Sequence, residues 1–521
     1  MTTESTQQRE GPSLSKRAFW IMFAKTLAFA FNFALPLVLV RRLSQAEFGL
    51  YKQAFLVVST AMVVLQLNFG MSAFYFLPRE GAERQRQIVF NVLLFNTLAG
   101  SLALLVLLLW PGLLEKIFNS PALVEYAALI GVVILLWVVS AFLEIVAVAH
   151  QELRLATFFI IASQVSRTTL LLAAALVAGT VRSLIYAAVV QGALQTVILI
   201  VYLRSRFRTF WRGFEWGVMR TQLAYALPFA GAGLLYTAQV DLHNYFVSNR
   251  FGEAAFAIYS VGCFQLPLVG ILAESIGSVM IPRMSELQKE GRAQEIVRLT
   301  ARATRKLAAI YFPLYLFLML IGQEFIVLLF REQYAASWPV FAVNLTLLPF
   351  NVVALDPIVR AFTEQRYYLL RLRVVTIVLL VVALWFSIER FGLVGAISVV
   401  VAIGLIERFA VAWRFGRLLG VSRRDWPLLA DVWKLGAAAL VAGAAAAFVK
   451  FFVVAGMKPF VVIVACGAAF SLCYLAAVIL LRVPSDEERE TFTRRVRVLR
   501  RLGFGKTSVG VAGEGSAPVG K

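Results

Sequence analysis

The sequence predicts an all-α polytopic membrane protein with about fourteen transmembrane helices, arranged as two pseudo-symmetric six-helix lobes followed by two C-terminal helices. Composition is the first observation behind this prediction. Hydrophobic residues make up 60% of the 521 and charged residues only 15%, against about 45–50% and about 25% in soluble domains. Long, continuous apolar runs are the second, because barrel strands alternate in pieces of about ten residues. A polar joint that occurs twice is the third.

The apolar runs are each long enough to cross a hydrocarbon core of about 30 Å at about 1.5 Å per residue. Only helices and closed barrels satisfy their backbone groups in lipid, and continuous runs indicate helices. The predicted spans are 18–40, 50–76, 88–112, 122–148, 155–178, 183–203, 221–248, 254–281, 303–330, 336–359, 369–388, 392–413, 431–455 and 460–481.

The joint between the first two spans reads RLSQAEFGLY at residues 42–51, and RFGEAAFAIY follows at residues 250–259. A repeat at this spacing indicates two copies of one membrane-embedded unit. Six spans per copy is an even number, so both copies have the same orientation and their symmetry axis runs along the membrane normal. The matching pairs, all 208 residues apart, are Arg42 with Arg250, Ala46 with Ala254, Phe48 with Phe256 and Tyr51 with Tyr259.

The repeat continues beyond the joint. Positions seven apart lie nearly on one helix face, so each copy carries a comparable stripe of such positions, and a central cleft is expected between the two lobes. At the same offset Lys52, Ser59 and Gln66 correspond to Ser260, Pro267 and Glu274. Later the offset becomes 212, and Glu144, Glu152 and Arg154 correspond to Asp356, Glu364 and Arg366.

The domain organisation follows from the spans and the composition of the segments between them. The connector 204–220 mixes arginines with phenylalanine and tryptophan, which is typical of an amphipathic segment on a membrane surface. The predicted units are a tail at 1–15, an N-lobe at 16–203, the amphipathic linker at 204–220, a C-lobe at 221–414, spans thirteen and fourteen within 415–481, and a basic tail at 482–521.

The placement of lysine and arginine predicts the orientation. Most of the 50 basic residues fall in the two tails and in the even-numbered joints, which puts both termini in the cytoplasm. This asymmetry also accounts for the net charge of +21 as an insertion signal and a face for anionic lipid. A nucleic-acid partner is therefore not expected.

Enzymatic and metal chemistry find no support in the sequence. The two histidines, His150 and His243, have no metal-ligand spacing, and the three cysteines lie inside apolar runs with no ligand or disulfide pattern. The joints on the outer side are short, which leaves no room for a sugar-handling active site. No cofactor and no enzymatic activity are expected.

Charged groups within spans are costly, at about 2.5–3.5 kcal/mol or more at the membrane centre, so they normally face a cavity or a partner. Arg167 lies midway along its span, where it either lines the cleft to meet an anionic substrate or forms a structural ion pair. The candidates are Lys25, Glu144, Arg167, Asp241, His243, Glu274, Asp356 and Glu407.

The remaining cations are expected near the outer mouth of the cleft or close to a membrane surface. Lys25 is near enough to its helix end to extend to the interface, so it is either a cleft cation or an interfacial residue. Arg41, Arg42, Lys52 and Arg250 either bind substrate or anchor the helices at the level of the headgroups.

The acidic candidates suggest ion coupling. Glu144 and Asp356 occupy equivalent places in the two copies, where they either carry a proton or pair with a basic group. Asp241, close to His243, either binds a cation or a proton or lines the water-filled outer opening of the cleft. Glu274 belongs to the repeated stripe, and Glu407 with its neighbour Arg408 is interpreted as a boundary residue.

The joint at residues 41–51, the sequence Asn68-Phe69-Gly70 after it, and Phe391–Ala396 at the opening of span twelve resemble bacterial polysaccharide flippases. These belong to the multidrug/oligosaccharidyl-lipid/polysaccharide exporter superfamily, and the resemblance covers residues 15–480. It implies the fold of the multidrug and toxin extrusion (MATE) transporters.

The resemblance further implies that the chain moves undecaprenyl-diphosphate-linked oligosaccharide from the cytoplasmic to the periplasmic leaflet of the bacterial inner membrane. Alternating access driven by a proton or sodium gradient is the implied mechanism, with a cationic cleft in which Lys25, Arg167 and the arginines of the outer mouth fit. Membrane lipids are implied partners, and polysaccharide polymerase machinery is left open as another. The alternatives are a multidrug cation exporter of the same fold and a flippase for lipid-linked peptidoglycan precursor.

Overall fold

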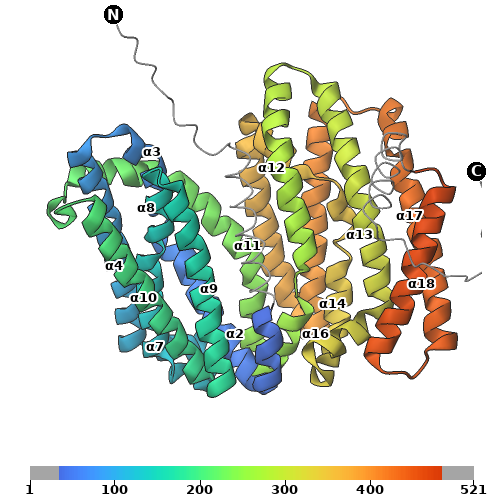
Figure 1. Cartoon of the computed structure of the whole chain (residues 1–521), viewed down its shortest axis with the longest axis horizontal. Helices are drawn as coiled ribbons and strands as arrows, with labels where there is room; N and C mark the ends of the chain where they lie inside the picture. The colour runs from blue at the N-terminus through green and yellow to red at the C-terminus, as the bar shows by residue number, and fades with distance from the viewer. Residues whose placement is uncertain (1–33, 484–521) are drawn as a thin grey trace, which may run out of the picture.

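A computed structural model describes residues 34–483 of the chain, and every regular element in that range is helical (Figure 1). Eleven helices in the described part are long and apolar enough to cross a membrane. This confirms the predicted all-α membrane fold. The parts of the predicted first span and of both tails that fall before residue 34 or after residue 483 lie outside the described residues.

The N-terminal half begins with helical residues 34–42, the end of the predicted first span. The joint follows, and a capping box starts the next helix: the Ser44 hydroxyl accepts the backbone N–H of Glu47 at 3.3 Å, and the Glu47 carboxylate accepts the backbone N–H of Ser44 at 2.9 Å. The helices of this half are α2 Gln45–Gln66, α3 Ser72–Phe76, α4 Ala82–Leu109, α5 Gly112–Phe118, α6 Pro121–Val124, α7 Ala127–Ser140, α8 Phe142–Ala149, α9 Leu153–Val177 and α10 Val181–Arg206.

The C-terminal half follows a short 3₁₀ turn, η3 Phe210–Arg212, inside the predicted amphipathic linker. Its elements are α11 Trp216–Gly262, α12 Pro267–Lys289, α13 Ala293–Phe330, η4 Glu332–Ser337, α14 Trp338–Leu345, η5 Pro349–Val352, α15 Leu355–Ala361, η6 Thr363–Gln365 and α16 Arg366–Leu418. The last two spans are η7 Arg423–Leu429 with α17 Ala430–Phe448, the π-helical turn η8 Val449–Val453, and α18 Pro459–Leu480.

Two of these helices each contain a reversal of chain direction at a glycine. Gly252 has φ 75° and ψ −175° inside α11, and Gly392 has φ 57° and ψ −140° inside α16. Positive φ is accessible to glycine at little cost because it has no Cβ. The reversal in α11 separates predicted spans seven and eight, and the one in α16 separates spans eleven and twelve.

Four predicted spans are less regular than their continuous apolar runs suggested. Span two breaks after α2 ends at Gln66, where the 3₁₀ turn η1 Phe69–Met71 precedes α3. Span four breaks at Ala141 between α7 and α8. Span eight is interrupted by residues 263–266, directly before Pro267. Span ten divides into α14, η5 and α15, with Pro349 starting the middle piece. Proline has no N–H to donate, so Pro267 and Pro349 account for the position of two of these breaks. Hydropathy predicts only the overall length of each span.

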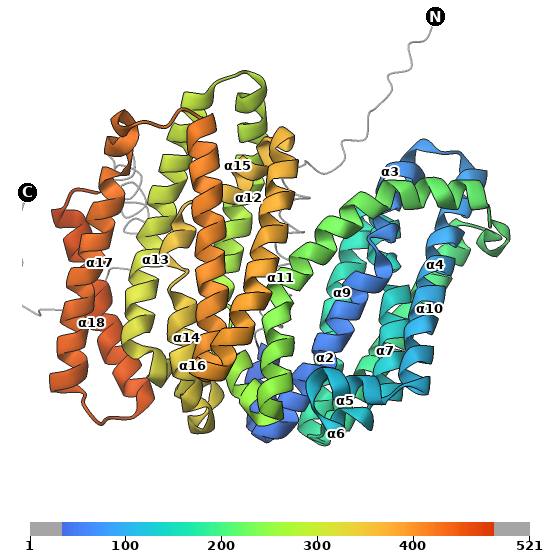
Figure 2. The ribbon, with the colours of Figure 1, turned by 180° about the vertical axis from the view of Figure 1, so that it is seen from behind.

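The two halves meet at one end of the molecule and diverge toward the other (Figures 1 and 2). The meeting end carries the joint before α2, the short helices α5 and α6, and the Gly252 reversal of α11. We call it the joint end. The opposite end, where α10 ends and where α12 connects to α13, is the tail end.

Helix α11 connects the halves physically as well as in sequence. Near its start, the Gln222 amide donates to the Ser72 hydroxyl at 3.1 Å and accepts from Asn91 at 3.2 Å, both at buried positions of the N-terminal half. Farther along, the buried Ser248 hydroxyl accepts from Gln53 of α2 at 2.7 Å. The beginning of α11 thus packs with the N-terminal half, and its Gly252 region packs at the joint end.

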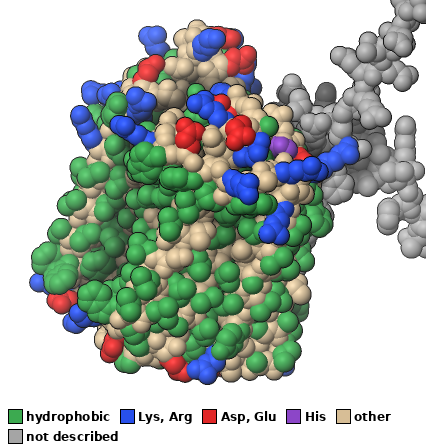
Figure 3. All heavy atoms as spheres, turned by 90° about the vertical axis from the view of Figure 1, so that its left-hand side faces the viewer, with side chains coloured by type: hydrophobic (Ala, Val, Ile, Leu, Met, Phe, Trp, Pro, Cys, Tyr) green, Lys and Arg blue, Asp and Glu red, His purple; other side chains and the backbone are tan. Residues whose placement is uncertain are grey.

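The surface has the pattern expected of a protein in lipid. On the face shown in Figure 3, hydrophobic side chains cover a broad middle band, and lysine and arginine gather mainly toward the tail end. Large apolar side chains such as Val177, Leu480 and Trp433 are more than three quarters exposed. Exposed apolar area on this scale is stable only when lipid or another protein covers it.

Candidate functional site

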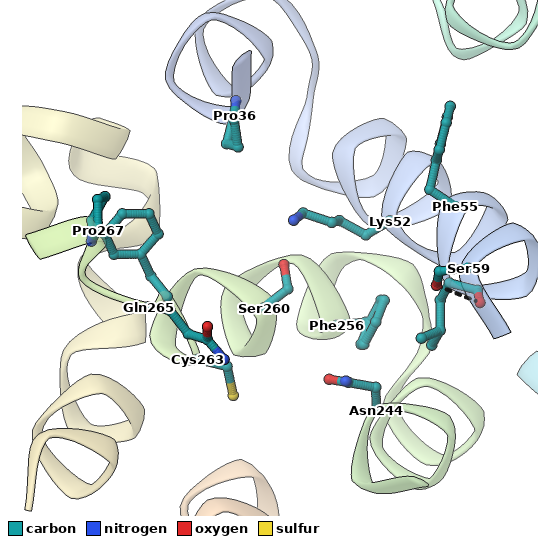
Figure 4. A pocket seen from close by; sticks show the side chains of 12 residues that line it. Pro36, Lys52, Phe55, Ser59, Asn244, Phe256, Ser260, Cys263, Gln265 and Pro267 are labelled. Atoms are coloured by element: carbon teal, nitrogen blue, oxygen red, sulfur yellow. Dashed lines mark hydrogen bonds between the residues drawn. The ribbon is translucent and has the colours of Figure 1, made fainter. Parts of the chain in front are cut away.

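A cavity of about 460 Å³ lies between the two repeated joints. Its walls come from α2, from α11 on both sides of Gly252, and from the turn leading into α12. Figure 4 shows side chains from these elements around a common space. The lining residues are Pro36, Lys52, Phe55, Leu56, Ser59, Asn244, Phe256, Ser260, Cys263, Phe264, Gln265 and Pro267.

The repeated stripe reaches this cavity from both copies. Lys52 and Ser59 line it from the first copy, and their equivalents Ser260 and Pro267 line it from the second. The two copies therefore place corresponding positions around one space, as expected of two similar units related by an axis through the cavity. The repeat is thus a property of the cavity lining as well as of the sequence.

Lys52 gives the cavity its charge, because it is the only charged side chain among the described lining residues. In Figure 4 its side chain extends from α2 into the space between Pro36 and Ser260. The ammonium nitrogen lies 5.6 Å from the centroid of the Phe48 ring, and no carboxylate of residues 34–483 forms an ion pair with it. A lysine in this position favours an anionic ligand. Lys25, the other predicted lysine, lies outside the described residues.

Arg167 lies within the N-terminal half and does not belong to the described cavity lining. Its guanidinium carbon is 4.0 Å from the centroid of the Trp137 ring. The Trp137 indole N–H donates to the carbonyl of Ala188 at 3.1 Å, which fixes the ring. Contact between a cation and a desolvated tryptophan face contributes about 2 kcal/mol. The ring therefore stabilises a charge that would otherwise be costly at this depth.

The predicted arginines of the outer mouth lie at the joint end, apart from the cavity lining. Arg41 donates to the backbone carbonyl of Leu328 at 3.2 Å, and Arg42 is exposed. Arg250 forms an ion pair with Glu389 at 3.6 Å, in which both side chains are about 60% exposed. The structure thus separates these three arginines from Lys52, with which the sequence had grouped them.

Glu144 belongs to a polar network inside the N-terminal half. It forms a side-chain hydrogen bond with Ser163, whose hydroxyl also accepts from the Gln195 amide. Gln195 in turn accepts from Ser140 at 3.4 Å. The network joins α7, α8, α9 and α10, so protonation or deprotonation of Glu144 would alter contacts within this half.

The other acidic candidates do not come together with Glu144. Asp356 forms an exposed ion pair with Arg360, one turn along α15, at 2.9 Å. Asp241 is partly buried on α11, and Glu274 is exposed on α12. The positions of Glu144 and Asp356 are equivalent in the repeat, but their surroundings differ.

A polar cluster in the C-terminal half was not predicted from the sequence. Glu407 accepts from the amide of Gln239 on α11 and pairs with Arg373 at 3.4 Å. The sequence had suggested a boundary role for Glu407 and none for Arg373 or Gln239. The occurrence of Arg373 and Glu407 in consecutive spans was the available signal. Nearby on α11, His243 is buried, and its Nδ1 lies 2.8 Å from the Tyr259 hydroxyl.

Solved structures of membrane transporters share the helical architecture of this chain. The lipid II flippase MurJ in an inward closed conformation is 13% identical, with a TM-score of 0.70 over 89% of this chain and 99% of that protein. An inward-facing multidrug resistance MATE family transporter of the MOP superfamily has a TM-score of 0.56 at 16% identity, over 76% of this chain and 96% of that protein.

A mutant of the MATE transporter VcmN of Vibrio cholerae gives a TM-score of 0.54 at 15% identity, over 79% of this chain and 98% of that protein. At these identities the likeness shows the fold. No curated protein matches the chain in sequence.

A family model described as "Polysaccharide biosynthesis protein" matches residues 38–339, more than half of the chain. The chain therefore belongs to this family of polysaccharide biosynthesis proteins. The predicted fold class is confirmed: the protein is a multi-pass membrane protein with the fold of these flippase and transporter structures.

Proposed function

We propose that the protein translocates undecaprenyl-diphosphate-linked oligosaccharide from the cytoplasmic to the periplasmic leaflet of the bacterial inner membrane. The family match to polysaccharide biosynthesis proteins supports a role in making a surface polysaccharide. The substrate's diphosphate is the group that a cationic cavity would hold. Transport proceeds by alternating access, with the cavity exposed to one side of the membrane at a time.

Lys52 is the observation that carries this proposal. A cationic drug would require a carboxylate in the cavity, whereas the only charged group among the described lining residues is a lysine. Aromatic and aliphatic side chains form the remaining walls together with a few hydrogen-bonding groups, among them Asn244 and Gln265. Such walls suit the stacking faces and hydroxyls of sugars near a diphosphate.

We place the joint end in the periplasm and both termini in the cytoplasm, because the basic residues favour the tail end. In that orientation the structure represents a state that is closed toward the periplasm. The cavity volume falls within the range of about 300–1,000 Å³ found for small-molecule sites. It would therefore hold the diphosphate and the nearest sugar, and the rest of the glycan and the prenyl chain would lie outside.

The other predicted cations would act around this site. Arg167 would add positive potential on the N-terminal side, and Lys25, outside the described residues, stays a predicted substrate contact. Arg41, Arg42 and Arg250 would meet the substrate only at the joint end, on its way out. The partners in this scheme are the lipid-linked oligosaccharide and membrane lipids, and a contact with polysaccharide polymerase belongs to the same proposal.

Coupling to a proton or sodium gradient is the remaining part of the proposal. Glu144, whose hydrogen bonds join four helix segments of one half, is the favoured carrier. Asp241, Glu274 and Asp356 are the further candidates in the C-terminal half. Protonation of a partly buried carboxylate removes a charge that is costly within the membrane, so it can bias one conformation over the other.

The direct test replaces Lys52 and measures the polysaccharide exposed on cells that lack the native gene. Lys52→Gln should reduce surface polysaccharide at least tenfold and accumulate the lipid-linked precursor, while Lys52→Arg should retain a substantial part of the activity. The matched control is Lys458→Gln, an exposed lysine before α18, which should behave like the native protein. All variants are compared at equal abundance in the membrane.

Normal polysaccharide from Lys52→Gln would remove the cavity cation from the proposal. Two other functions are distinguished by the same strains. Export of cationic drugs predicts unchanged polysaccharide and increased drug sensitivity in the deletion strain. A flippase for lipid-linked peptidoglycan precursor predicts that loss of the gene causes cell lysis and cannot be tolerated, because that pathway builds the wall itself.

A further inference from the structure

We propose that the joint end is closed by a two-fold lock, two equivalent sets of hydrogen bonds through which each half holds the other. This inference concerns the gate of the proposed transport cycle and in that respect rests on the proposed function. The contacts themselves do not depend on the identity of the substrate. Five side chains form the lock: Arg41, Gln45 and Ser120 in the first copy, and Asn249 and Glu253 in the second.

The first pair of contacts joins equivalent positions across the two halves. Arg41 donates to the carbonyl of Leu328 at 3.2 Å. Asn249 donates to the carbonyls of Lys116 and Ile117 at 3.1 and 3.0 Å. Arg41 and Asn249 are related by the offset of 208, and Lys116 and Leu328 by the offset of 212. The same bond is thus made twice, once in each direction between the halves.

The second pair of contacts also joins positions that correspond in the two copies, with one offset larger by one residue. The Gln45 amide donates to the carbonyl of Gln333, and the Ser120 hydroxyl donates to the Glu253 carboxylate. Gln45 and Glu253 are 208 apart, and Ser120 and Gln333 are 213 apart. The chemistry of the bond differs between the two copies, but the positions correspond. Gln45 and Glu253 each start the second span of their own half, and each contacts the turn that precedes the fourth span of the opposite half.

Helix ends explain why these acceptors are available. The last carbonyls of a helix have no partner within it, and α5 ends at Phe118 while α13 ends at Phe330. The next residues, Asn119 and Arg331, both have positive φ, 51° and 75°. Asn119 and Arg331 are 212 apart, so in both copies a helix ends at the equivalent position with a positive φ, although ψ differs, at 43° for Asn119 and 164° for Arg331. The orphan carbonyls of Lys116, Ile117 and Leu328 before them receive the first pair of contacts of the lock.

Close backbone packing lies beside the lock. A Cβ placed on Gly49 would be 1.9 Å from the carbonyl oxygen of Glu253, so only glycine allows α2 to approach the second joint this closely. Because both sets of bonds span the same seam between the halves, separation at the joint end must break them together. The lock therefore opens as one unit and not in two independent halves.

The test introduces cysteine pairs into a background in which Cys263, Cys466 and Cys473 are replaced by alanine, and bridges them with a short bifunctional thiol reagent that a reductant cleaves. One pair is Gln45→Cys with Gln333→Cys, and the equivalent pair is Ser120→Cys with Glu253→Cys. The control is Glu125→Cys with Arg182→Cys, an ion-paired position at the joint end within the N-terminal half.

Two readouts are taken in membrane vesicles: transport, and the labelling of a cavity cysteine at Ser260→Cys by an impermeant reagent added from the joint side. Bridging either lock pair should abolish both, and reductant should restore both. The control pair should change neither. A third outcome separates the two proposals. If bridging the lock pairs abolishes labelling but no variant transports the lipid-linked oligosaccharide even without bridging, the lock is supported and the proposed substrate is contradicted.

Single substitutions test the equivalence. Arg41→Ala and Asn249→Ala should each increase labelling from the joint side by about fivefold, which corresponds to the net value of about one hydrogen bond. Arg182→Ala should leave labelling unchanged. The proposal is overturned if a bridged lock pair still admits the reagent from the joint side, or if only one of the two equivalent pairs controls access.

Discussion

The two repeats agree at the gate and differ in the cavity. At the joint end Arg41 and Asn249 make equivalent bonds to helix-terminal carbonyls. In the cavity the first copy contributes Lys52 and the second contributes Ser260 at the matching position. The backbone arrangement is therefore kept twice, whereas the charge is present once.

This difference follows from what each region must do. A seam between two similar halves is closed most simply by equivalent contacts, because each half presents the same acceptors to the other. A ligand without two-fold symmetry gains nothing from a second cation opposite the first. Two lysines facing each other in a cavity would also repel and raise the cost of burying charge. Symmetry at the gate and asymmetry in the cavity are thus both expected.

Moving the cation to the other repeat sharpens this comparison and has the larger expected effect. Lys52→Ser alone should reduce surface polysaccharide at least tenfold, because it leaves the described lining without a charge. Adding Ser260→Lys should restore activity several-fold above the single variant, since the lysine again reaches the same space. Ser260→Lys alone should lower activity through the repulsion of two like charges. Equal loss in the single and double variants would show that the place of the charge matters as much as its presence.

Removing the exposed arginines of the two joints has the smallest expected effect. Arg250 pairs with Glu389 at the surface, and such pairs contribute about 0–1 kcal/mol. Arg250→Ala and its equivalent Arg42→Ala should each change surface polysaccharide less than twofold, with the abundance of the protein in the membrane as the control. A tenfold loss in either variant would show that these arginines contribute as much to transport as the cavity lysine and would weaken the distinction between the two regions.

Much of the fold could be predicted because lipid constrains it strongly. The length of each apolar run gave the spans, and the joint at residues 42–51 revealed the repeat before any contact was known. The breaks in spans two, four, eight and ten could not be predicted in the same way. A hydropathy profile records how apolar a segment is, whereas a break depends on a single proline, on backbone conformation and on tertiary contacts.

The candidate site was harder to predict for a related reason. Depth in the membrane can be read from position in a span, but the direction of a side chain depends on how its helix packs. Arg167 has the depth expected of a cleft residue, yet it lies over Trp137 in the N-terminal half. Lys52 was assigned to the outer mouth by its distance from the joint, and α2 directs it into the cavity. The stripe that the repeat defined was the better guide.

Protection of a cavity cysteine tests the central claim most directly. Purified protein carrying Ser260→Cys, in a background with its native cysteines replaced by alanine, is labelled with a thiol reagent in detergent with and without undecaprenyl-diphosphate-linked oligosaccharide. The account predicts that the lipid-linked oligosaccharide slows labelling at least fivefold and that Lys52→Gln removes this protection. Equal labelling rates with and without the substrate, in protein that retains its fold, would contradict the claim that the cavity between the repeats holds the anionic lipid.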